Sequence, residues 1–284
     1  MYEAHPYPNP LVSADLIQDL ANSIAFLSRC NDFEGREVLD AGCGTGQRLV
    51  AVAKMFPSAS FTGLDVSGAS LQTAEALAAR HGVANIRFVE HDLLLPLSDK
   101  FDVIVSTGVI HHLAEPEAGL RHLVSALKDN GFIMLWLYHQ YGEFARLLDR
   151  QLAQIFWRNS GSFQPADRPK LLRQLGLSLS PEQYGTRSAH QGSASNQSSI
   201  DVDAFLHPIV NTYTFSETFA LLRRAGADWI APNGVNRPHE SKLIDLGRVE
   251  ADPFLTVEAG DLFQDPRIRA RYEQLSKEEK LILG

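Results

Sequence analysis

Short apolar runs alternate with longer segments of helical periodicity over the first half of the chain. The short runs have the length of strands, and the segments between them place apolar residues three and four positions apart, as amphipathic helices do. This alternation predicts right-handed β-α-β units and a parallel sheet. We expect strands at residues 37–41, 60–65, 86–90, 101–106 and 132–138, and helices at residues 13–28, 46–56, 68–81 and 116–129.

The regular alternation stops after residue 140. Residues 141–157 and 168–177 have helical patterns, and residues 185–200 are small and polar, as in a linker. Thr214 and Glu217 then form the pattern of a capping box, before a helix that ends near Arg224. We expect a sixth strand at residues 227–230, a seventh near residues 243–246, and a charged helical stretch over residues 267–281.

These patterns divide the chain into five parts. In open α/β sheets the carboxyl ends of the strands hold the ligands, so an insertion after the fifth strand is well placed to cover a substrate. The parts are an N-terminal arm and helix (1–30), a Rossmann-like core (31–140), an insertion of helices and loop (141–212), the completion of the core (213–249) and a C-terminal helical tail (250–284).

Residues 38–46, with the sequence VLDAGCGTG, carry the strongest chemical signal. A strand that ends in Asp40 runs into three glycines at alternate positions and then into a helix. Glycine has no Cβ, so a ligand can lie against bare backbone at such a turn. The dinucleotide fingerprint G-x-G-x-x-G needs its third glycine one position later, where this chain has Gln47.

The pattern G-x-G-x-G after an acidic residue resembles motif I of the class I S-adenosylmethionine-dependent methyltransferases. The order and spacing of the elements over residues 36–139, and less closely over residues 212–232, are similar to the core of that family. The resemblance implies a Rossmann-like, doubly wound α/β fold with a seven-stranded, mostly parallel sheet. The residues after the fifth strand would then form a helical cap insertion.

The resemblance also implies a binding site for S-adenosylmethionine, which leaves as S-adenosylhomocysteine. Asp65, at the end of the second strand, would accept bonds from the ribose hydroxyls, with Val66 beside it. Asp92 would take the adenine amino group, and the Leu93 N–H a ring nitrogen. The turn itself would hold the methionine part and Thr107 would lie under the sulfonium, so the expected binding residues are Asp40, Gly42, Cys43, Gly44, Gly46, Asp65, Val66, Asp92, Leu93 and Thr107.

Residues 101–113 resemble motif IV of the small-molecule methyltransferases, in which a histidine commonly stands at the position of His112. Asn/Asp-Pro-Pro-Tyr/Phe, which is frequent in enzymes that methylate base or amide nitrogens, is replaced by residues 106–109 (STGV). Residues 201–214 resemble, more loosely, an insertion found in a group of bacterial methyltransferases. The candidate catalytic residues are His112, His139, His207 and Tyr213, with His111 beside them, and His5 and Tyr7 are candidates to fold over the cofactor site.

The charge and the cysteine content of the chain restrict the kinds of partner and compartment to expect. The formal net charge is −8 and there is no run of Lys or Arg, which argues against nucleic acid. The two cysteines make no disulfide framework, no signal peptide is visible, and no apolar run is long enough to span a bilayer, so we expect a cytoplasmic protein without a membrane partner. The histidines show no zinc-type spacing, and no metal is expected.

The expected activity is therefore transfer of a methyl group to an O or N atom of a small molecule. Two alternatives remain open from the sequence: methylation of a protein side chain, and a non-catalytic module that binds S-adenosylmethionine. A nicotinamide-dependent oxidoreductase is disfavoured by the glycine spacing. The acceptor and the oligomeric state are not specified by the sequence.

Overall fold

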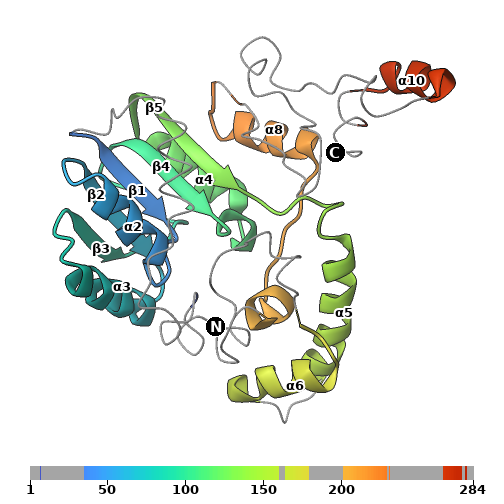
Figure 1. The fold of residues 1–284 in the computed structure, drawn as a ribbon, viewed down its shortest axis with the longest axis horizontal. Coiled ribbons are helices and arrows are strands. Elements are labelled where there is room, and N and C mark those ends of the chain that lie inside the picture. The colour runs from blue at the N-terminus through green and yellow to red at the C-terminus, as the bar shows by residue number, and fades with distance from the viewer. Residues whose placement is uncertain are drawn as a thin grey trace. The chain divides into compact units, whose positions relative to one another are not determined.

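The computed structural model describes residues 7, 35–159, 164–178, 201–228, 230, 265–276 and 279. The chain divides into two compact units. One consists of Met1–Tyr138 and Gly142–Thr212, and the other of His139–Tyr141 and Tyr213–Gly284. Figure 1 labels the helices and strands of both.

The first unit contains a five-stranded parallel sheet with the strand order β3-β2-β1-β4-β5. From β1 at the centre of the sheet, the chain forms β2 and β3 on one side. It then crosses to the other side of β1, where it forms β4 and β5. Ligands in such sheets bind outside the carboxyl ends of the strands, where the order reverses. The strands are β1 (Glu37–Ala41), β2 (Ser60–Asp65), β3 (Ile86–Glu90), β4 (Phe101–Thr107) and β5 (Leu127–Trp136).

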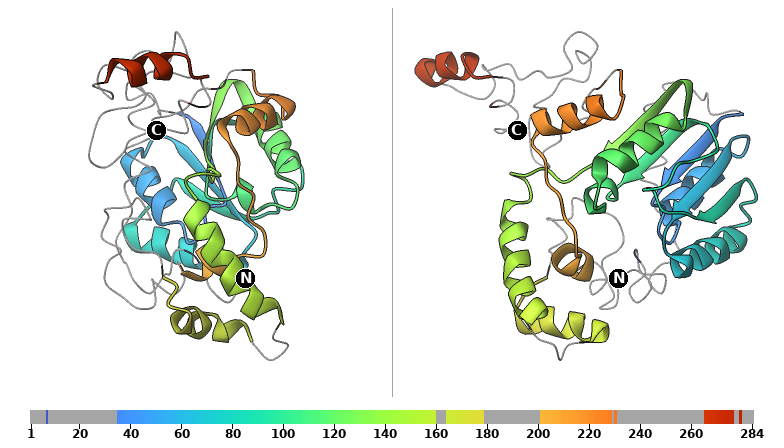
Figure 2. Two further views of the ribbon diagram at one scale, coloured as in Figure 1. Left: turned by 90° about the vertical axis from the view of Figure 1, so that its right-hand side faces the viewer. Right: turned by 180° about the vertical axis from the view of Figure 1, so that it is seen from behind.

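Helices cover both faces of this sheet. Figure 2 shows α2 (Gln47–Met55) and α3 (Gly68–His81) together on one face and α4 (Pro116–Ser125) on the other. The chain adds β2 and then β3 in one direction from β1, and it adds β5 in the opposite direction from β4. Because each crossover is right-handed, the connecting helices of the two halves lie on opposite faces. Ser67 caps α3 by accepting the Ser70 N–H, and Gly82 ends the helix in a left-handed conformation, as the sequence predicted.

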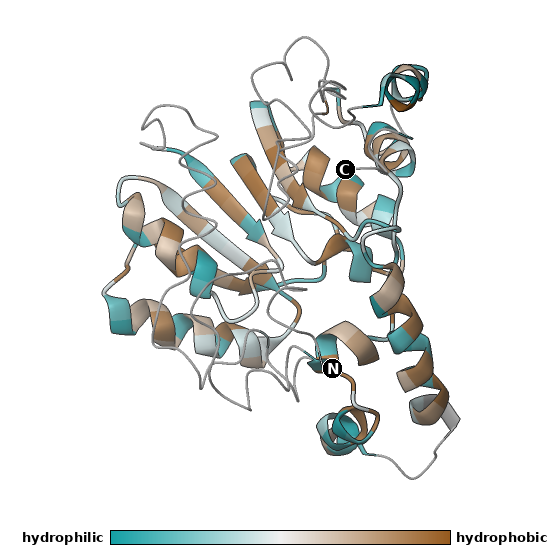
Figure 3. Cartoon of the chain, turned by 45° about the vertical axis from the view of Figure 1, so that its right-hand side comes forward, coloured by the Kyte–Doolittle hydropathy of each residue, from teal (hydrophilic) through white to brown (hydrophobic). Residues whose placement is uncertain are grey.

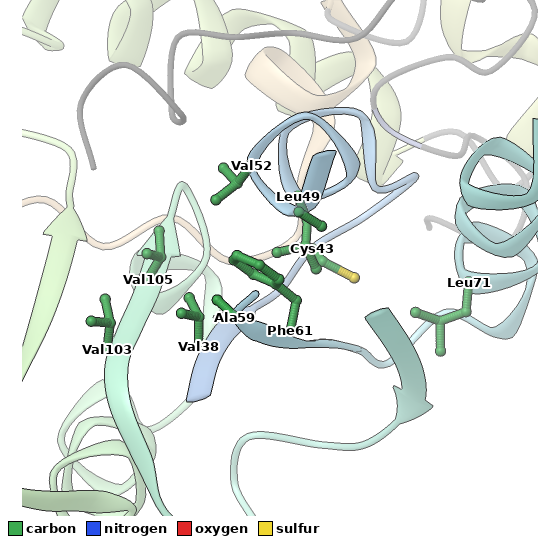
Figure 4. Packing of buried hydrophobic residues seen from close by; sticks show 10 residues of the cluster. Val38, Cys43, Leu49, Val52, Ala59, Phe61, Leu71, Val103 and Val105 are labelled. Carbon is green, nitrogen blue, oxygen red and sulfur yellow. The ribbon is translucent and has the colours of Figure 1, made fainter. Parts of the chain in front are cut away.

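The core lies between the sheet and its helices. Figure 3 shows that the strands are largely hydrophobic. In Figure 4 side chains from β1, β2 and β4 meet Leu49 and Val52 of α2 around Phe61. The apolar run of β4 is buried on both faces, with Val103, Ile104 and Val105 at most 3% exposed. Such burial is expected for a central parallel strand.

The prediction of seven strands is wrong for the described residues, which hold the five strands above. Ala227, Asp228 and Ile230, where a sixth strand was expected, are not in a strand, and residues 243–246 lie outside the described residues. The sixth strand was predicted from a run of only four residues that includes the charged Asp228, and the seventh from analogy with a family.

The helix predicted over residues 116–129 is also too long, because α4 ends at Ser125 and β5 begins at Leu127. Lys128 pairs with Asp102 of β4 and Glu37 of β1, which holds this segment at the sheet. The strand is irregular at its start, since Phe101 pairs with Leu127 and Val103 with Phe132. Asn130, which has a left-handed φ of 62°, lies among the residues between Leu127 and Phe132 that have no partner in this register.

After β5 the first unit continues with α5 (Phe144–Asn159) and α6 (Arg168–Gln174), close to the two helices that the sequence predicted. Residues 201–206 form a further helix that was not predicted, and residues 185–200 lie outside the described residues. These helices share a small core of their own, against which Tyr7 packs: Ala153, Leu172, Leu177, Val202, Ala204, Phe205 and Leu206.

The second unit contains α8 (Phe215–Arg224) and α10 (Pro266–Glu273). The capping box is confirmed, since the Glu217 N–H donates to Thr214 Oγ1 and the Thr214 N–H to Glu217 Oε2. Helix α10 is shorter than the stretch predicted over residues 267–281, because residues 274–276 are not helical. No helix within the described ranges has the length and apolar character needed to cross a membrane.

Candidate active site

The glycine turn at the end of β1 has the backbone shape that the sequence predicted. Gly42, Gly44 and Gly46 have φ angles of 90°, 53° and 75°, in the left-handed region that glycine adopts without strain. Gly46 is the N-cap of α2. A Cβ added at Gly42 would lie 2.2 Å from Cγ2 of Val109, on the loop after β4. Both conformation and space therefore require glycine here, because the Val109 side chain packs against the turn.

The N–H groups of this turn are all bonded within the protein. A site for a dinucleotide or a nucleoside triphosphate instead directs several free N–H groups at phosphate. The turn therefore suits a nucleoside ligand without phosphate, and it weighs against a nicotinamide dinucleotide. The bonds run from Gly42 and Cys43 to the Leu64 carbonyl, from Gly44 to Asp65, from Thr45 to the Tyr7 carbonyl and from Gly46 to the Cys43 carbonyl.

Asp65 ties the turn to the second strand. Its Oδ2 accepts the Gly44 N–H at 2.8 Å, and its Oδ1 accepts the Ser67 N–H at 2.9 Å, just before α3. Each carboxylate oxygen has two lone pairs, so a bond to one N–H group does not by itself prevent a bond to a second donor. Val66, the next residue, is 61% exposed. The helix-start role and the ribose role of Asp65 are therefore compatible.

Asp40 lies buried at the end of β1, with 5% of its surface exposed. Burial raises the pKa of its carboxyl to about 7; Arg48 lowers it in part, and Asp65 raises it further. Arg48, in the first turn of α2, also donates from Nη1 to Thr107 Oγ1 at 3.5 Å. A carboxyl group with this pKa changes its charge near neutral pH.

Asp92 and Leu93 follow β3, as expected. Asp92 is exposed, and its Oδ1 accepts the Leu94 N–H at 2.9 Å in a local turn. Leu93 is buried, and its carbonyl lies 3.1 Å from Nδ1 of His122. Asp92 thus fixes a turn and still presents its carboxylate to solvent.

Cys43 is buried inside the turn, where burial raises the pKa of its thiol, so it stays protonated. Sγ of Cys43 would lie 2.8 Å from a Cβ at Gly63 on β2, so the thiol fills the space between the turn and the sheet. Its side chain packs in the core. The side chain of Cys43 is therefore not available to a ligand.

A second group of side chains lies beyond the carboxyl ends of β4 and β5, and we call it the polar cluster. Two of its members stand on the 3₁₀ helix η1 (Ile110–His112), one follows β5, two stand on α5 and one follows the helix of residues 201–206. The members are His111, His112, Tyr138, Arg146, Arg150 and His207, all in the first unit.

The rings of the polar cluster are in direct contact. The His111 ring stacks on Tyr138 with a centroid distance of 3.7 Å. The His112 ring lies 3.8 Å from that of His207. The Arg146 guanidinium lies 3.9 Å above the Tyr138 ring, donates to Tyr138 Oη at 3.2 Å, and pairs with Glu143. Residues far apart in the sequence are therefore packed into one group.

Residues 207–211 are bonded to η1 through backbone and side chains. Nδ1 of His112 lies 2.7 Å from the Ile209 carbonyl oxygen, and Nδ1 of His207 lies 2.5 Å from the same oxygen. The Ile209 N–H also lies 3.1 Å from Nδ1 of His207. A ring nitrogen of a neutral imidazole either donates or accepts a hydrogen bond. The shorter distance to the carbonyl oxygen indicates that Nδ1 of His207 donates to the Ile209 carbonyl. Arg150 donates to the His207 carbonyl.

The three imidazoles are neutral near pH 7. Burial lowers the pKa of His111 to about 2 and that of His207 to about 3, and burial is also the largest cause of the lowered pKa of His112. Both ring nitrogens of His111 and Nε2 of His112 are buried without a hydrogen-bond partner among the described residues. An unpartnered buried polar atom costs about 1–3 kcal/mol, so three of them together call for a functional explanation.

His139 and Tyr213, the other two candidates, belong to the second unit. They form an isolated bridge, and the Gln140 N–H donates to the Tyr213 carbonyl at 3.0 Å. The His139 ring lies 5.0 Å from that of Phe215. Burial lowers the pKa of His139 and raises that of Tyr213.

Sequence reasoning missed Tyr138, Arg146, Arg150 and Asn211 as parts of this region. The two arginines had a usable signal, because they are four residues apart and so share one face of a helix. Asn211 had none, since its role depends on contacts with residues about a hundred positions earlier. Within the described chain, no three His, Cys, Asp or Glu side chains are grouped to hold a metal ion.

Comparisons with known proteins show what the chain is similar to. A family model described as a methyltransferase domain matches residues 32–157. An uncharacterized protein of Synechococcus sp. (strain ATCC 27144 / PCC 6301 / SAUG 1402/1) is 29% identical over 98% of this chain and 65% of its own length. The malonyl-[acyl-carrier protein] O-methyltransferase of Paenibacillus sp. (strain JDR-2) is 32% identical over 43% of this chain and 46% of its own length.

Among solved structures, PKMT2 from Rickettsia typhi has a TM-score of 0.50 and 20% identity, over 68% of this chain and 38% of that protein. This likeness shows the fold. The chain spans less than two thirds of the length of these relatives, 65% of the Synechococcus protein and 46% of the Paenibacillus enzyme. Residues 32–157 therefore match a methyltransferase domain, in the part of the chain that has the fold shared with PKMT2.

Proposed function

We propose that the protein transfers a methyl group from S-adenosylmethionine to an oxygen or nitrogen atom of a small molecule, with a hydroxyl oxygen favoured. The family supports the reaction type, and relatives matched over the core include enzymes named as O-methyltransferases. The observation that carries the proposal beyond the family is the polar cluster, in which three buried imidazole nitrogens have no partner within the described residues.

The glycine turn fits the cofactor. Its left-handed glycines carry no side chain that could extend into a ligand, and its N–H groups are bonded internally, as suits a ligand without phosphate. Asp65 with Val66 would hold the ribose, and Asp92 with the Leu93 N–H the adenine. The methionine part would lie along residues 42–46 near Asp40 and Thr107. When bound, S-adenosylmethionine supplies a methyl group on positively charged sulfur.

The polar cluster supplies a base for the acceptor. Because the Ile209 carbonyl can only accept, Nδ1 of His112 carries the proton and Nε2 holds a lone pair. That lone pair is suited to take the proton of an acceptor hydroxyl as the oxygen attacks the methyl carbon. S-adenosylmethionine would supply the methyl carbon and keep the electron pair of the broken sulfur–carbon bond, and His112 would afterwards lose the proton to solvent. An amine acceptor that is already neutral would need this base less.

The burial of the cluster supports a small acceptor. His111 is fully buried and His207 is 6% exposed, so an acceptor must enter a space shielded by α5 and residues 201–211. We propose that residues 141–212 form the cap over the acceptor. A protein side chain would need a more open approach, and a non-catalytic module would have no use for unpartnered nitrogens.

The test is a screen of metabolite extracts with S-adenosylmethionine labelled in its methyl group. We expect the label to appear in a small molecule, together with S-adenosylhomocysteine. Label found only in protein would favour the side-chain alternative. Tight binding of S-adenosylmethionine without any labelled product, across extracts and protein fractions, would favour the non-catalytic module.

A further inference from the structure

Asn211 contributes three hydrogen bonds between residues 207–211 and the loop after β4. The Asn211 N–H donates to the His111 carbonyl at 2.8 Å. Its side-chain nitrogen donates to the same carbonyl at 3.2 Å and to the Leu113 carbonyl at 3.0 Å. Both partners of the side chain are carbonyl oxygens, so the amide nitrogen must face them and the orientation of the amide is determined. Asn211 therefore bridges the two ends of the turn that carries His112.

The same segment determines which nitrogen of His112 holds the proton. The Ile209 carbonyl stands two residues before Asn211 and receives the Nδ1–H of His112. If this carbonyl moved away, the two neutral tautomers would become close in energy, and Nε2 would carry the proton for part of the time. An imidazole protonated at Nε2 has no lone pair there to accept a proton.

We propose that Asn211 is a positioning residue for methyl transfer: it holds the inserted segment so that the Ile209 carbonyl keeps the lone pair of His112 on Nε2. This inference depends on the proposed function, in which that lone pair takes the proton of the acceptor. Asn211 itself forms and breaks no bond in the reaction. Its function is comparable to that of the groups that orient a catalytic histidine through its other ring nitrogen.

The surroundings of His112 also depend on this attachment. The titratable and charged groups that face it are His111 on η1, Tyr138 after β5, Arg146 and Arg150 on α5, and Asp203 and His207 on the inserted segment. Burial lowers the pKa of His112, and Asp203 and the bond to Ile209 raise it by smaller amounts. Detaching the segment would expose the ring and move its pKa upward toward the ordinary value.

Asn85 provides a matched control. Its side-chain nitrogen also donates to backbone carbonyls, those of Ala53, Phe56 and Ala59, and it is half-buried like Asn211. It lies before β3, away from the polar cluster. Asn85→Ala and Asn211→Ala therefore remove similar bonds, but only the second touches His112. Asn211→Asp, which keeps the shape and loses the donors, serves if Asn211→Ala does not fold.

The decisive readout is the pair of ring-nitrogen chemical shifts of His112 in isotope-labelled protein, assigned with His112→Gln. In the wild type we expect Nδ1 at the shift of an N–H and Nε2 at the shift of a lone pair. In the Asn211 variant both shifts should move toward their mean, and in Asn85→Ala they should stay unchanged. These shifts are read without cofactor or acceptor, so failure to find any methyl acceptor counts against the proposed function and leaves this test intact.

Kinetics with an identified acceptor give the second readout. For Asn211→Ala we expect kcat to fall about tenfold or more, because a positioned base contributes at least that much. The KM for S-adenosylmethionine should stay unchanged. The pH at which kcat is half-maximal should increase, because the pKa of His112 moves upward toward its ordinary value. Unchanged nitrogen shifts in the Asn211 variant would overturn the proposal. So would equal changes in Asn85→Ala, since these would mean that general loosening and not positioning is responsible.

Discussion

Nδ1 of His112 lies 2.7 Å from the carbonyl oxygen of Ile209, although the two residues are 97 positions apart in the chain. His112 belongs to the loop after β4, in the core of the domain, whereas Ile209 belongs to the segment inserted after β5. The proposed acceptor end of the site therefore draws on both the core and the segment after β5. The proposed cofactor end, at the glycine turn, draws on the core and on Tyr7, whose carbonyl accepts the Thr45 N–H. Substitutions at the two ends should have separable effects.

His207→Ala tests the acceptor end. The ring of His207 packs 3.8 Å from that of His112, and residues of the glycine turn do not depend on it. We expect turnover to be abolished. The affinity for S-adenosylmethionine should stay within about twofold, because the substitution removes no proposed contact with the cofactor. His81→Ala, at the end of α3, is the control and should change neither. Turnover retained in His207→Ala would exclude the insertion from the acceptor site.

Asp65→Ala tests the cofactor end. The carboxylate accepts two N–H groups in the free protein and would accept the ribose hydroxyls in the complex. We expect the affinity for S-adenosylmethionine to fall by about 1–3 kcal/mol, measured by calorimetry. Asp102 is the matched control, because it accepts the Glu37 N–H and pairs with Lys128 at the opposite end of the strands. Asp102→Ala should lose stability but not affinity, and unchanged affinity in Asp65→Ala would refute the ribose assignment.

Gly42→Ala tests the need for bare backbone. Gly42 has a left-handed φ of 90°, which is strained for alanine. The added Cβ would also lie 2.2 Å from Cγ2 of Val109. The conformation alone costs about 1–2 kcal/mol and the overlap about 1–3 kcal/mol more. Gly82→Ala shares the left-handed conformation, but nothing lies within 4 Å of its Cβ, so it should show only the first cost. Thermal unfolding measures both, and equal losses in the two variants would show that Val109 does not confine the turn.

The pKa of Asp40 gives a prediction on pH. The folded pKa of about 7 lies above the ordinary value of 3.8, so ionisation of this group lowers the stability of the free protein as pH rises from about 4 to about 7. Binding of a cation favours the ionised form, so affinity for S-adenosylmethionine should fall as pH drops below 7, by at most about tenfold for each unit. His111 and His207, with pKa values of about 2 and 3, stay neutral over this range.

Calorimetry between about pH 8 and pH 6 checks this, in buffers of different ionisation enthalpy that reveal the proton released on binding. Asp40→Asn should bind with little dependence on pH. A wild-type affinity that is constant over this range, or an equal slope in the variant, would contradict the assignment of Asp40.

The sequence was sufficient for the elements that depend on local patterns. Strands β1, β2 and β3, helix α3 with its Ser67 cap and the Thr214 capping box lie where periodicity and capping residues place them. The glycine turn was equally readable, because only glycine satisfies its left-handed angles. A short pattern was not sufficient: the sixth strand was predicted from four residues only, and the described residues 227, 228 and 230 lie outside any strand.

Long-range relationships could not be read from the sequence. An argument from hydrophobic faces would turn Phe144, Leu148, Leu152 and Ile155 of α5 toward the protein, since they are spaced along one side of the helix. These side chains are 41–63% exposed, and the opposite side brings Arg146 and Arg150 to the polar cluster. Tertiary contacts with Tyr138 and His207 decide this orientation, and no local pattern encodes them.

The most direct test of the account is calorimetry of the purified protein with S-adenosylmethionine, S-adenosylhomocysteine and NAD⁺. We predict that the first two bind at one shared site with comparable affinity, that both are weakened by Asp65→Ala, and that NAD⁺ does not bind. Binding of NAD⁺ in their place, or binding of S-adenosylmethionine that Asp65→Ala leaves unchanged, would contradict the claim that the glycine turn holds the cofactor.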